Sequence, residues 1–232
     1  MKTILEKKVA LYPITIFLGI LSSFSLPPYN HIYFNFLVFP ILLFIILNNN
    51  GRIKLFFIGW NFGFGYFISN LYWITNSLTF DDNLKNLIPF ALILIPSFLA
   101  LFFGLITFLT SFFVLKSKIS SIFIFSFSFG FVEFFRSFIL GGFPWNLTVF
   151  SLTNYLSSIQ ILSFVGTYSL NLLSITIFLF PAVIFFQYRN ITKILIILSG
   201  LFIILANIGY GKYNLDQFKN KNYENLDFAI RI

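Results

Sequence analysis

A succession of long apolar runs separated by short polar segments constrains this chain more than any other feature of its sequence. Each run is close to the ~20 residues that an α-helix needs to cross the hydrocarbon core of a bilayer. On this measure we predict seven helical spans, over residues 10–26, 32–48, 55–76, 87–115, 119–140, 157–187 and 191–209. The sequence therefore predicts an all-α fold, a polytopic transmembrane bundle of about seven spans.

The composition supports this fold class. Of the 232 residues, 58% are hydrophobic and only 9% are charged, which is too little charge to cover the surface of a soluble domain. We interpret the 37 phenylalanines as a bias of the whole chain and as lipid-facing bulk, not as a cofactor pocket. The fourth and sixth runs are longer than one span needs. Pro89, Pro96 and Pro181 are therefore candidate breaks, with helix tilt as the alternative.

The distribution of basic residues predicts the orientation. Lysine and arginine precede the first run and follow the second, fourth and sixth, whereas the segments between them are poor in basic residues. By the positive-inside rule the N-terminus is cytoplasmic. An odd number of spans then places residues 211–232 outside, as an extracytoplasmic tail after a transmembrane domain over residues 1–210. The net charge of +8 is thus largely topological, and we expect no nucleic acid as a partner.

The sequence offers no thiol or metal chemistry. It contains no cysteine, which excludes disulfides, thiolate ligands and a cysteine nucleophile within these residues. Its one histidine, His31, stands alone in a short polar turn. We therefore expect neither a metal site nor a cofactor.

The most informative polar residues lie in the fifth run. Glu133 and Arg136 are three residues apart and so share one helix face, and charges in hydrocarbon are costly unless they serve a site or a packed pair. Both interpretations stay open, because a buried ion pair can specify packing without chemistry. Arg136 lies near the outer end of the run, where a guanidinium can extend to lipid phosphates. Trp145 follows where an interfacial anchor is expected.

Two stripes of small and polar side chains predict close helix contacts. They recur at helical spacing in the third and fifth runs, where such faces let membrane helices pack closely and hydrogen-bond. The stripes are Gly59, Gly63, Tyr66, Asn70, Trp73 and Ser77, and Ser126, Gly130, Glu133 and Ser137.

At the fifth run the chain resembles a known family. A helix with Glu133 and Arg136 that runs into Gly142, Phe143, Pro144 and Trp145 resembles the most recognisable membrane motif of bacterial apolipoprotein N-acyltransferases. Other stretches are similar to that family in the same order, so the resemblance covers about residues 10–232. These stretches are residues 26–29, the glycine-rich residues 63–74 with Tyr72 and Trp73, and residues 160–171.

The resemblance implies a role in lipoprotein biosynthesis in a bacterial inner membrane. The family transfers an acyl chain from a phospholipid, through a cysteine thioester, to the N-terminal diacylglyceryl-cysteine of an apolipoprotein. It implies that Arg136 and Trp145 contact the lipid, that Glu133 fixes the arginine, and that Tyr72 and Trp73 line the opposite wall. The implied lipid-binding set is Glu133, Arg136, Phe143, Pro144, Trp145, Tyr72 and Trp73, with no catalytic residue in it.

The family's catalytic Glu-Lys-Cys triad lies in an extracytoplasmic nitrilase-like domain. Residues 225–232 resemble the opening strand of that domain, and the missing cysteine means that these residues do not hold the nucleophile. Whether this chain is an active enzyme is therefore open. The alternatives are an inactive truncated fragment, a split enzyme whose nitrilase-like half is a separate chain, and an unrelated small membrane transporter. The absence of a second-half repeat disfavours the transporter.

Overall fold

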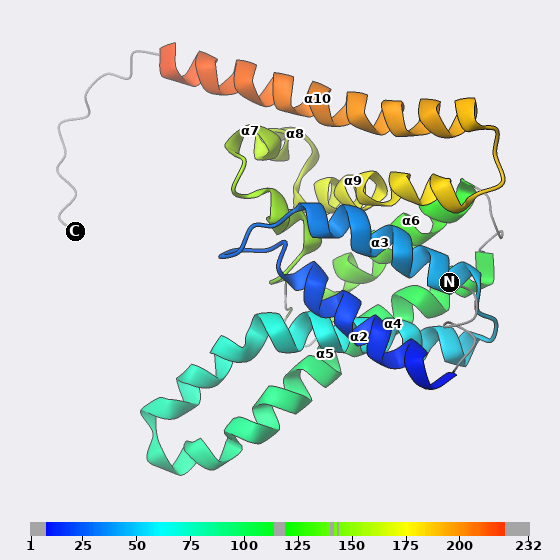
Figure 1. Cartoon of the computed structure of the whole chain (residues 1–232). Helices are drawn as coiled ribbons and strands as arrows, with labels where there is room; N and C mark the ends of the chain where they lie inside the picture. The colour runs from blue at the N-terminus through cyan, green and yellow to red at the C-terminus, as the bar shows by residue number, and fades with distance from the viewer. Residues whose placement is uncertain (1–7, 114–118, 140–141, 143, 221–232) are drawn as a thin grey trace, which may run out of the picture.

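The computed structural model describes residues 8–113, 119–139, 142 and 144–220, and in this part of the chain every regular element is a helix (Figure 1). The all-α prediction is therefore confirmed for these residues. The α-helices are α2 (Lys8–Ser23), α3 (Tyr33–Leu47), α4 (Arg52–Leu71), α5 (Ile88–Phe113), α6 (Ser120–Arg136), α7 (Leu156–Ile159), α8 (Leu162–Val165), α9 (Thr167–Leu179) and α10 (Asn190–Asn220). Shorter 3-10 segments connect them: η1 (Tyr72–Phe80), η2 (Asp82–Leu87), η4 (Thr148–Leu152) and η5 (Phe180–Phe185).

Three helical segments are long and apolar enough to cross a membrane. They are Asp82–Phe113, Thr167–Phe185 and Asn190–Phe218, and they fall in the fourth, sixth and seventh predicted spans. Helices α2, α3 and α6 are shorter, with 16, 15 and 17 residues. Helix α4 has 20 residues but carries two charges and several glycines, which lower its hydropathy. The count of seven spans and the orientation therefore stay predictions.

Two predicted spans are interrupted in the structure. The run over 55–76 is α-helical only to Leu71 and then continues as the 3-10 segment η1. The run over 157–187 breaks at Gly166, whose φ of +77° separates α8 from α9. Glycine adopts this conformation without steric cost, whereas other residues rarely do. Of the proline candidates, Pro96 lies inside α5, whereas Pro89 stands at the change from η2 to α5 and Pro181 at the change from α9 to η5.

Helix α10 extends past the predicted end of the seventh span. It continues from Asn190 to Asn220, so the expected boundary at residue 211 falls inside a helix. The stretch over 225–232 that resembles the start of another domain lies outside the described residues. The proposed division of the chain at that point stays a prediction.

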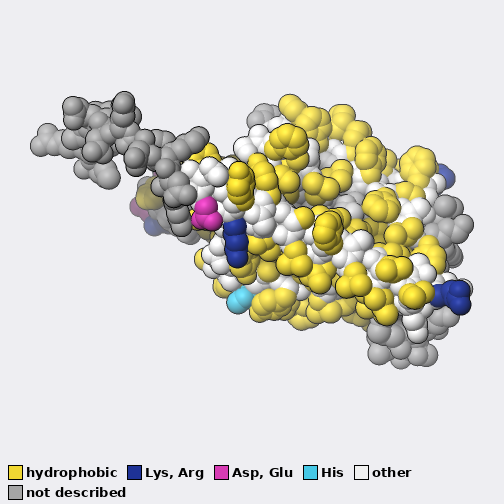
Figure 2. Space-filling view, turned by 90° about the horizontal axis from the view of Figure 1, so that it is seen from above, with side chains coloured by type: hydrophobic (Ala, Val, Ile, Leu, Met, Phe, Trp, Pro, Cys, Tyr) yellow, Lys and Arg dark blue, Asp and Glu magenta, His cyan; other side chains and the backbone are white. Residues whose placement is uncertain are grey.

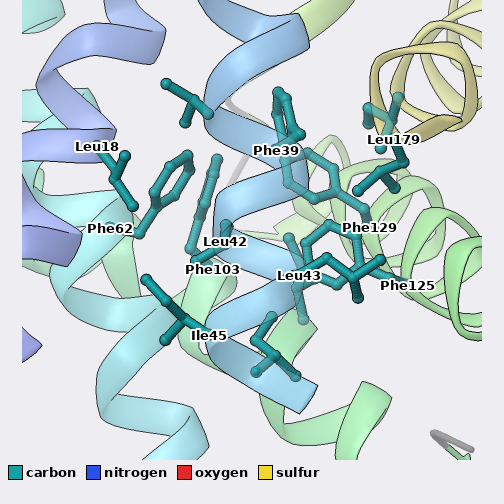
Figure 3. Packing of buried hydrophobic residues seen from close by; sticks show 14 of the residues in the cluster. Leu18, Phe39, Leu42, Leu43, Ile45, Phe62, Phe103, Phe125, Phe129 and Leu179 are labelled. Carbon is teal, nitrogen blue, oxygen red and sulfur yellow. The ribbon is translucent and has the colours of Figure 1, made fainter. Parts of the chain in front are cut away.

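The core of the molecule is aromatic and is centred on α3. The ring of Phe39 lies 6.1 Å from Phe62 on α4 and 5.6 Å from Phe129 on α6, measured between centroids (Figure 3). Phe103 on α5 extends the group, 5.7 Å from Phe62. The interpretation of the phenylalanines as lipid-facing bulk is therefore wrong for these residues, because the centre of the bundle needs large side chains to fill it.

Glycines let α4 pack closely against both of its neighbours. A Cβ at Gly65 would collide with the main-chain carbonyl of Ile16 on α2. A Cβ at Gly59 would collide with the carbonyl of Phe103 on α5. Such close approach is typical of membrane helices that pair through small residues. Of these two glycines only Gly59 belongs to the predicted stripe, whose close packing is confirmed there, whereas Trp73 of that stripe lies beyond the end of α4, in η1.

Helix α10 is the least buried of the three membrane-length segments. Only 6% of its most apolar window is buried. It lies along one side of the molecule, over α9 and the short helices α7 and α8 (Figure 1). Figure 2 looks onto this side and shows a surface that is largely hydrophobic, with charged side chains near its ends. A helix that is apolar on all its exposed faces is suited to contact with hydrocarbon.

Candidate functional site

Glu133 and Arg136 lie at the end of α6 and are both buried, each with a side chain that is 1% exposed. The Nη2 atom of Arg136 lies 3.5 Å from Oε1 of Glu133. The same nitrogen donates a hydrogen bond of 3.2 Å to the main-chain carbonyl of Trp145. Arg136 is thus turned inward under the chain that follows α6, whereas the sequence suggested a side chain extended to the surface.

Glu133 is also held from a second helix. Asn171 on α9 donates a hydrogen bond from Nδ2 to Oε2 of Glu133, and its Oδ1 accepts one of 2.9 Å from the main-chain N–H of Val149. Asn171 is fully buried. These bonds connect α6, α9 and the start of η4. The sequence analysis did not single out Asn171, although an asparagine within an apolar helix was a signal that could have identified it.

The segment after α6 folds back over the ion pair. Gly142 has a φ of +81°, and a Cβ there would collide with the main-chain oxygen of Ser137. Asn146 also has a positive φ, of +58°, and its carbonyl accepts a hydrogen bond of 2.9 Å from the hydroxyl of Tyr66 on α4. Glycine is therefore required at position 142, where the chain passes close to the main chain of Ser137. The predicted site residue Phe143 lies outside the described residues.

Trp73 and Trp145 form a stacked pair above this segment. Their ring centroids are 5.6 Å apart with an interplanar angle of 19°, and both side chains are about half exposed. The structure thus brings together two segments that the sequence analysis placed on opposite walls. Tyr72 and Pro144 are exposed. Neither residue is among the described residues that line a cavity beside Arg136.

A cavity of about 350 Å³ lies beside Arg136, between α5 and the segment that ends α6. The Nε and Nη1 atoms of Arg136 are buried and have no hydrogen-bond partner among the described residues. The ring of Phe67 lies 5.4 Å from the guanidinium carbon. The other described lining residues are apolar: Leu94, Ile95, Phe98, Leu99, Phe102, Ile139 and Gly142.

This arrangement joins a buried cation to an apolar pocket. A guanidinium with unpaired N–H groups binds phosphate or carboxylate oxygens in a fixed, forked geometry. The apolar walls are suited to a hydrocarbon chain attached to such a group. Within the described part of the chain, no group of three or more His, Cys, Asp or Glu side chains could hold a metal ion.

Comparison with known proteins gives a consistent result. Residues 18–183 match the sequence model of the apolipoprotein N-acyltransferase N-terminal domain. The apolipoprotein N-acyltransferase of Brucella melitensis is 29% identical over 92% of this chain and 41% of its own length. That of Allorhizobium ampelinum is 30% identical over 85% of this chain and 38% of its own length. That of Rhodopseudomonas palustris is 34% identical over 74% of this chain and 33% of its own length. The chain thus spans at most about two fifths of the length of these relatives.

Proposed function

The chain belongs to the apolipoprotein N-acyltransferase family, and from this premise we propose that it forms the membrane portion of such an enzyme. This portion binds the phospholipid that donates an acyl chain and the diacylglyceryl-cysteine terminus of the apolipoprotein that receives it. Membership of this family replaces the alternative of an unrelated transporter. Because the chain has no cysteine, the thiolate nucleophile comes from a nitrilase-like part outside these residues. The split-enzyme alternative differs only in which chain carries that part.

The proposed setting is a bacterial inner membrane crossed seven times, with the N-terminus in the cytoplasm. Three membrane-length helices support this setting directly. At a rise of ~1.5 Å per residue, the shorter helices cover about 22–26 Å, so a few flanking residues complete a span of ~30 Å. Arg52 and Lys54 at the start of α4 and Lys193 at the start of α10 mark the cytoplasmic side. The Trp73–Trp145 pair then lies at the outer interface, where tryptophan is favoured.

One observation carries the proposed lipid site: Arg136 is buried, its Nε and Nη1 atoms have no hydrogen-bond partner among the described residues, and it lines an apolar cavity. Glu133 is shared between Arg136 and Asn171, so it satisfies only part of the guanidinium. The remaining donors suit the phosphate of a phospholipid, because charge-assisted bonds to phosphate are strong where water is excluded. One acyl chain then lies along α5, against Leu94, Phe98 and Phe102.

The experiment compares two lipids that differ only in the phosphate. The full chain is delipidated in detergent, and native mass spectrometry measures its binding of dioleoyl phosphatidylethanolamine and of dioleoylglycerol. We expect the wild type to prefer the phospholipid. Arg136→Gln should reduce that preference by roughly tenfold or more, since a hydrogen bond to a charged group contributes about 1.5–3 kcal/mol. The lipid preference of Arg136→Lys should lie between those of the wild type and Arg136→Gln, because lysine keeps the positive charge but cannot bind phosphate through two parallel N–H groups.

Arg189→Gln is the matched control, because it removes an exposed arginine from the segment between η5 and α10. It should leave the lipid preference unchanged. Circular dichroism establishes that each variant keeps its helices. If folded Arg136→Gln still prefers the phospholipid as strongly as the wild type, Arg136 does not bind the phosphate, and the proposed site is wrong.

A further inference from the structure

A second apolar site lies beneath α10 and shares no described lining residue with the cavity beside Arg136. It consists of two cavities of about 410 and 160 Å³. Phe36 on α3, Ile177 on α9 and Ile204 on α10 line both of them. Because they share these walls, the two cavities are adjacent, and together we call them the α10 groove.

The α10 groove lies between two places where α10 is attached to the rest of the molecule. Near one end, Nδ2 of Asn207 donates a hydrogen bond of 2.9 Å to the main-chain carbonyl of Ser158 in α7. Near the other, Nζ of Lys193 donates one of 3.1 Å to the carbonyl of Ile184 in η5. Between these attachments the two cavities lie on the inner side of α10, and Gly200 brings the helix against the ring of Phe180 in η5, where a Cβ would collide with it.

The lining of the α10 groove is apolar along its length and polar at one end. The apolar part is lined by residues such as Phe180, Ile197 and Leu201. The polar end contains Asn207 and Ser158, near α7. The Oδ1 atom of Asn207 is buried there and accepts no hydrogen bond from the described residues. The groove therefore suits a molecule with a long apolar part and a hydrogen-bond donor at one end.

The dimensions of the groove fit a single hydrocarbon chain. From Ile197 to Asn207 the helix rises about 15 Å, which is half of the ~30 Å hydrocarbon core and so about one leaflet. Another helix cannot enter. At ~10 Å across and equally long it would occupy on the order of 1,200 Å³, whereas the larger cavity has about 410 Å³. An empty apolar space of this size would lose dispersion contacts on all its walls, and a lipid chain restores them.

We propose that the α10 groove holds one acyl chain of a resident phospholipid from the outer leaflet, distinct from the acyl donor. The choice of leaflet rests on the proposed orientation, which puts Asn207 toward the outer face. The chain of this lipid packs between α10 and the α3–α9 surface, and its glycerol or headgroup donor pairs with Asn207. The lipid thereby supplies the contacts that α10 does not make with the protein.

The test fills the groove from α10 itself. Ile204→Phe enlarges a side chain that lines both cavities, whereas Ile203→Phe makes the same change at the neighbouring position, which is 43% exposed. The full chain is purified in mild detergent, and native mass spectrometry counts bound phospholipid before and after dioleoyl phosphatidylethanolamine is added back. We expect the wild type and Ile203→Phe to carry one phospholipid more than Ile204→Phe, whose affinity for the resident lipid should be roughly tenfold lower, a difference of about 1.4 kcal/mol.

Arg136→Gln separates this inference from the proposed substrate site. The resident lipid should remain bound to that variant, because the two sites share no described residue. Loss of the retained lipid in Arg136→Gln, with no loss in Ile204→Phe, would assign the lipid to the Arg136 cavity and overturn the inference alone. A wild-type chain that retains no phospholipid would also overturn it, since α10 would then close the groove by its own side chains.

Discussion

Two buried regions meet on α6: the aromatic core around Phe39, and a polar cluster that consists of Glu133, Arg136 and Asn171. Phe129 belongs to the core, and Glu133 lies one turn further along the same helix. Both regions are almost fully buried. In the core, the rings of Phe62 and Phe129 contact Phe39 at interplanar angles of 54° and 71°, with no polar group to orient them. In the polar cluster, each bond joins a particular donor to a particular acceptor.

The difference between them concerns what each region can tolerate. Dispersion contacts depend on volume and distance, so the aromatic core should accept another apolar side chain of similar size. Removing one partner of a buried hydrogen bond lowers stability much more, because the remaining partner is still shielded from water and no longer has a hydrogen bond to compensate. Equilibrium unfolding of the full chain with dodecyl sulfate in mixed micelles measures this contrast.

The largest effect is expected from Glu133→Leu. This change leaves the guanidinium of Arg136 buried without its carboxylate, and we expect the free energy of unfolding to fall by about 3–5 kcal/mol. The control is the double variant Glu133→Leu with Arg136→Met, which removes both charges. It should recover most of that loss, because an apolar pair of similar volume is often neutral in place of a buried ion pair. If Glu133→Leu is as stable as the double variant, the loss of Glu133 does not destabilise the protein through Arg136, and the prediction is wrong.

A smaller effect is expected from Asn171→Leu. The variant keeps a similar volume but leaves the N–H of Val149 and one oxygen of Glu133 without a partner, so it should cost about 1–3 kcal/mol. Thr176→Val on the same helix is the control. The hydroxyl of Thr176 bonds only to the carbonyl of Leu172 one turn away among the contacts described, so little change is expected. Equal losses in the two variants would contradict the role of Asn171 as a link between helices.

The smallest effect is expected from Phe39→Leu in the aromatic core. Leucine keeps most of the apolar contacts, and the neighbouring rings can adjust, so the loss should be about 1 kcal/mol. The comparison with Asn171→Leu is direct, because both variants place leucine at a fully buried position. If Phe39→Leu costs more than Asn171→Leu, the core is as specific as the polar cluster, and the contrast drawn above is wrong.

Much of the fold could be predicted because it depends on local sequence. The apolar runs predicted helices that the structure confirms in the described residues, and the spacing of Glu133 and Arg136 placed them on one face of α6. The glycine positions in α4 predicted close packing. The break at Gly166 was missed, because a glycine in an apolar run is equally compatible with a continuous membrane helix.

The site could be predicted only in part. Trp145 and Arg136 were both predicted to contact the lipid, but the bond between the guanidinium and the Trp145 carbonyl depends on tertiary structure. Asn171 is 38 positions from Glu133, and its contact requires α6 and α9 to pack side by side. The lining of the cavity beside Arg136 comes mainly from α5, which the sequence did not associate with it.

The sequence by itself determined the helical class, the apolar character and the family of this protein, because each of these depends on residue type and spacing along the chain. The tertiary structure decided which donors of Arg136 have no partner among the described residues, where the cavities lie and how little of α10 is buried. The physical reason is that hydrogen-bond pairing and cavity volume depend on distances between atoms far apart in the chain. Only the packing of the helices determines those distances.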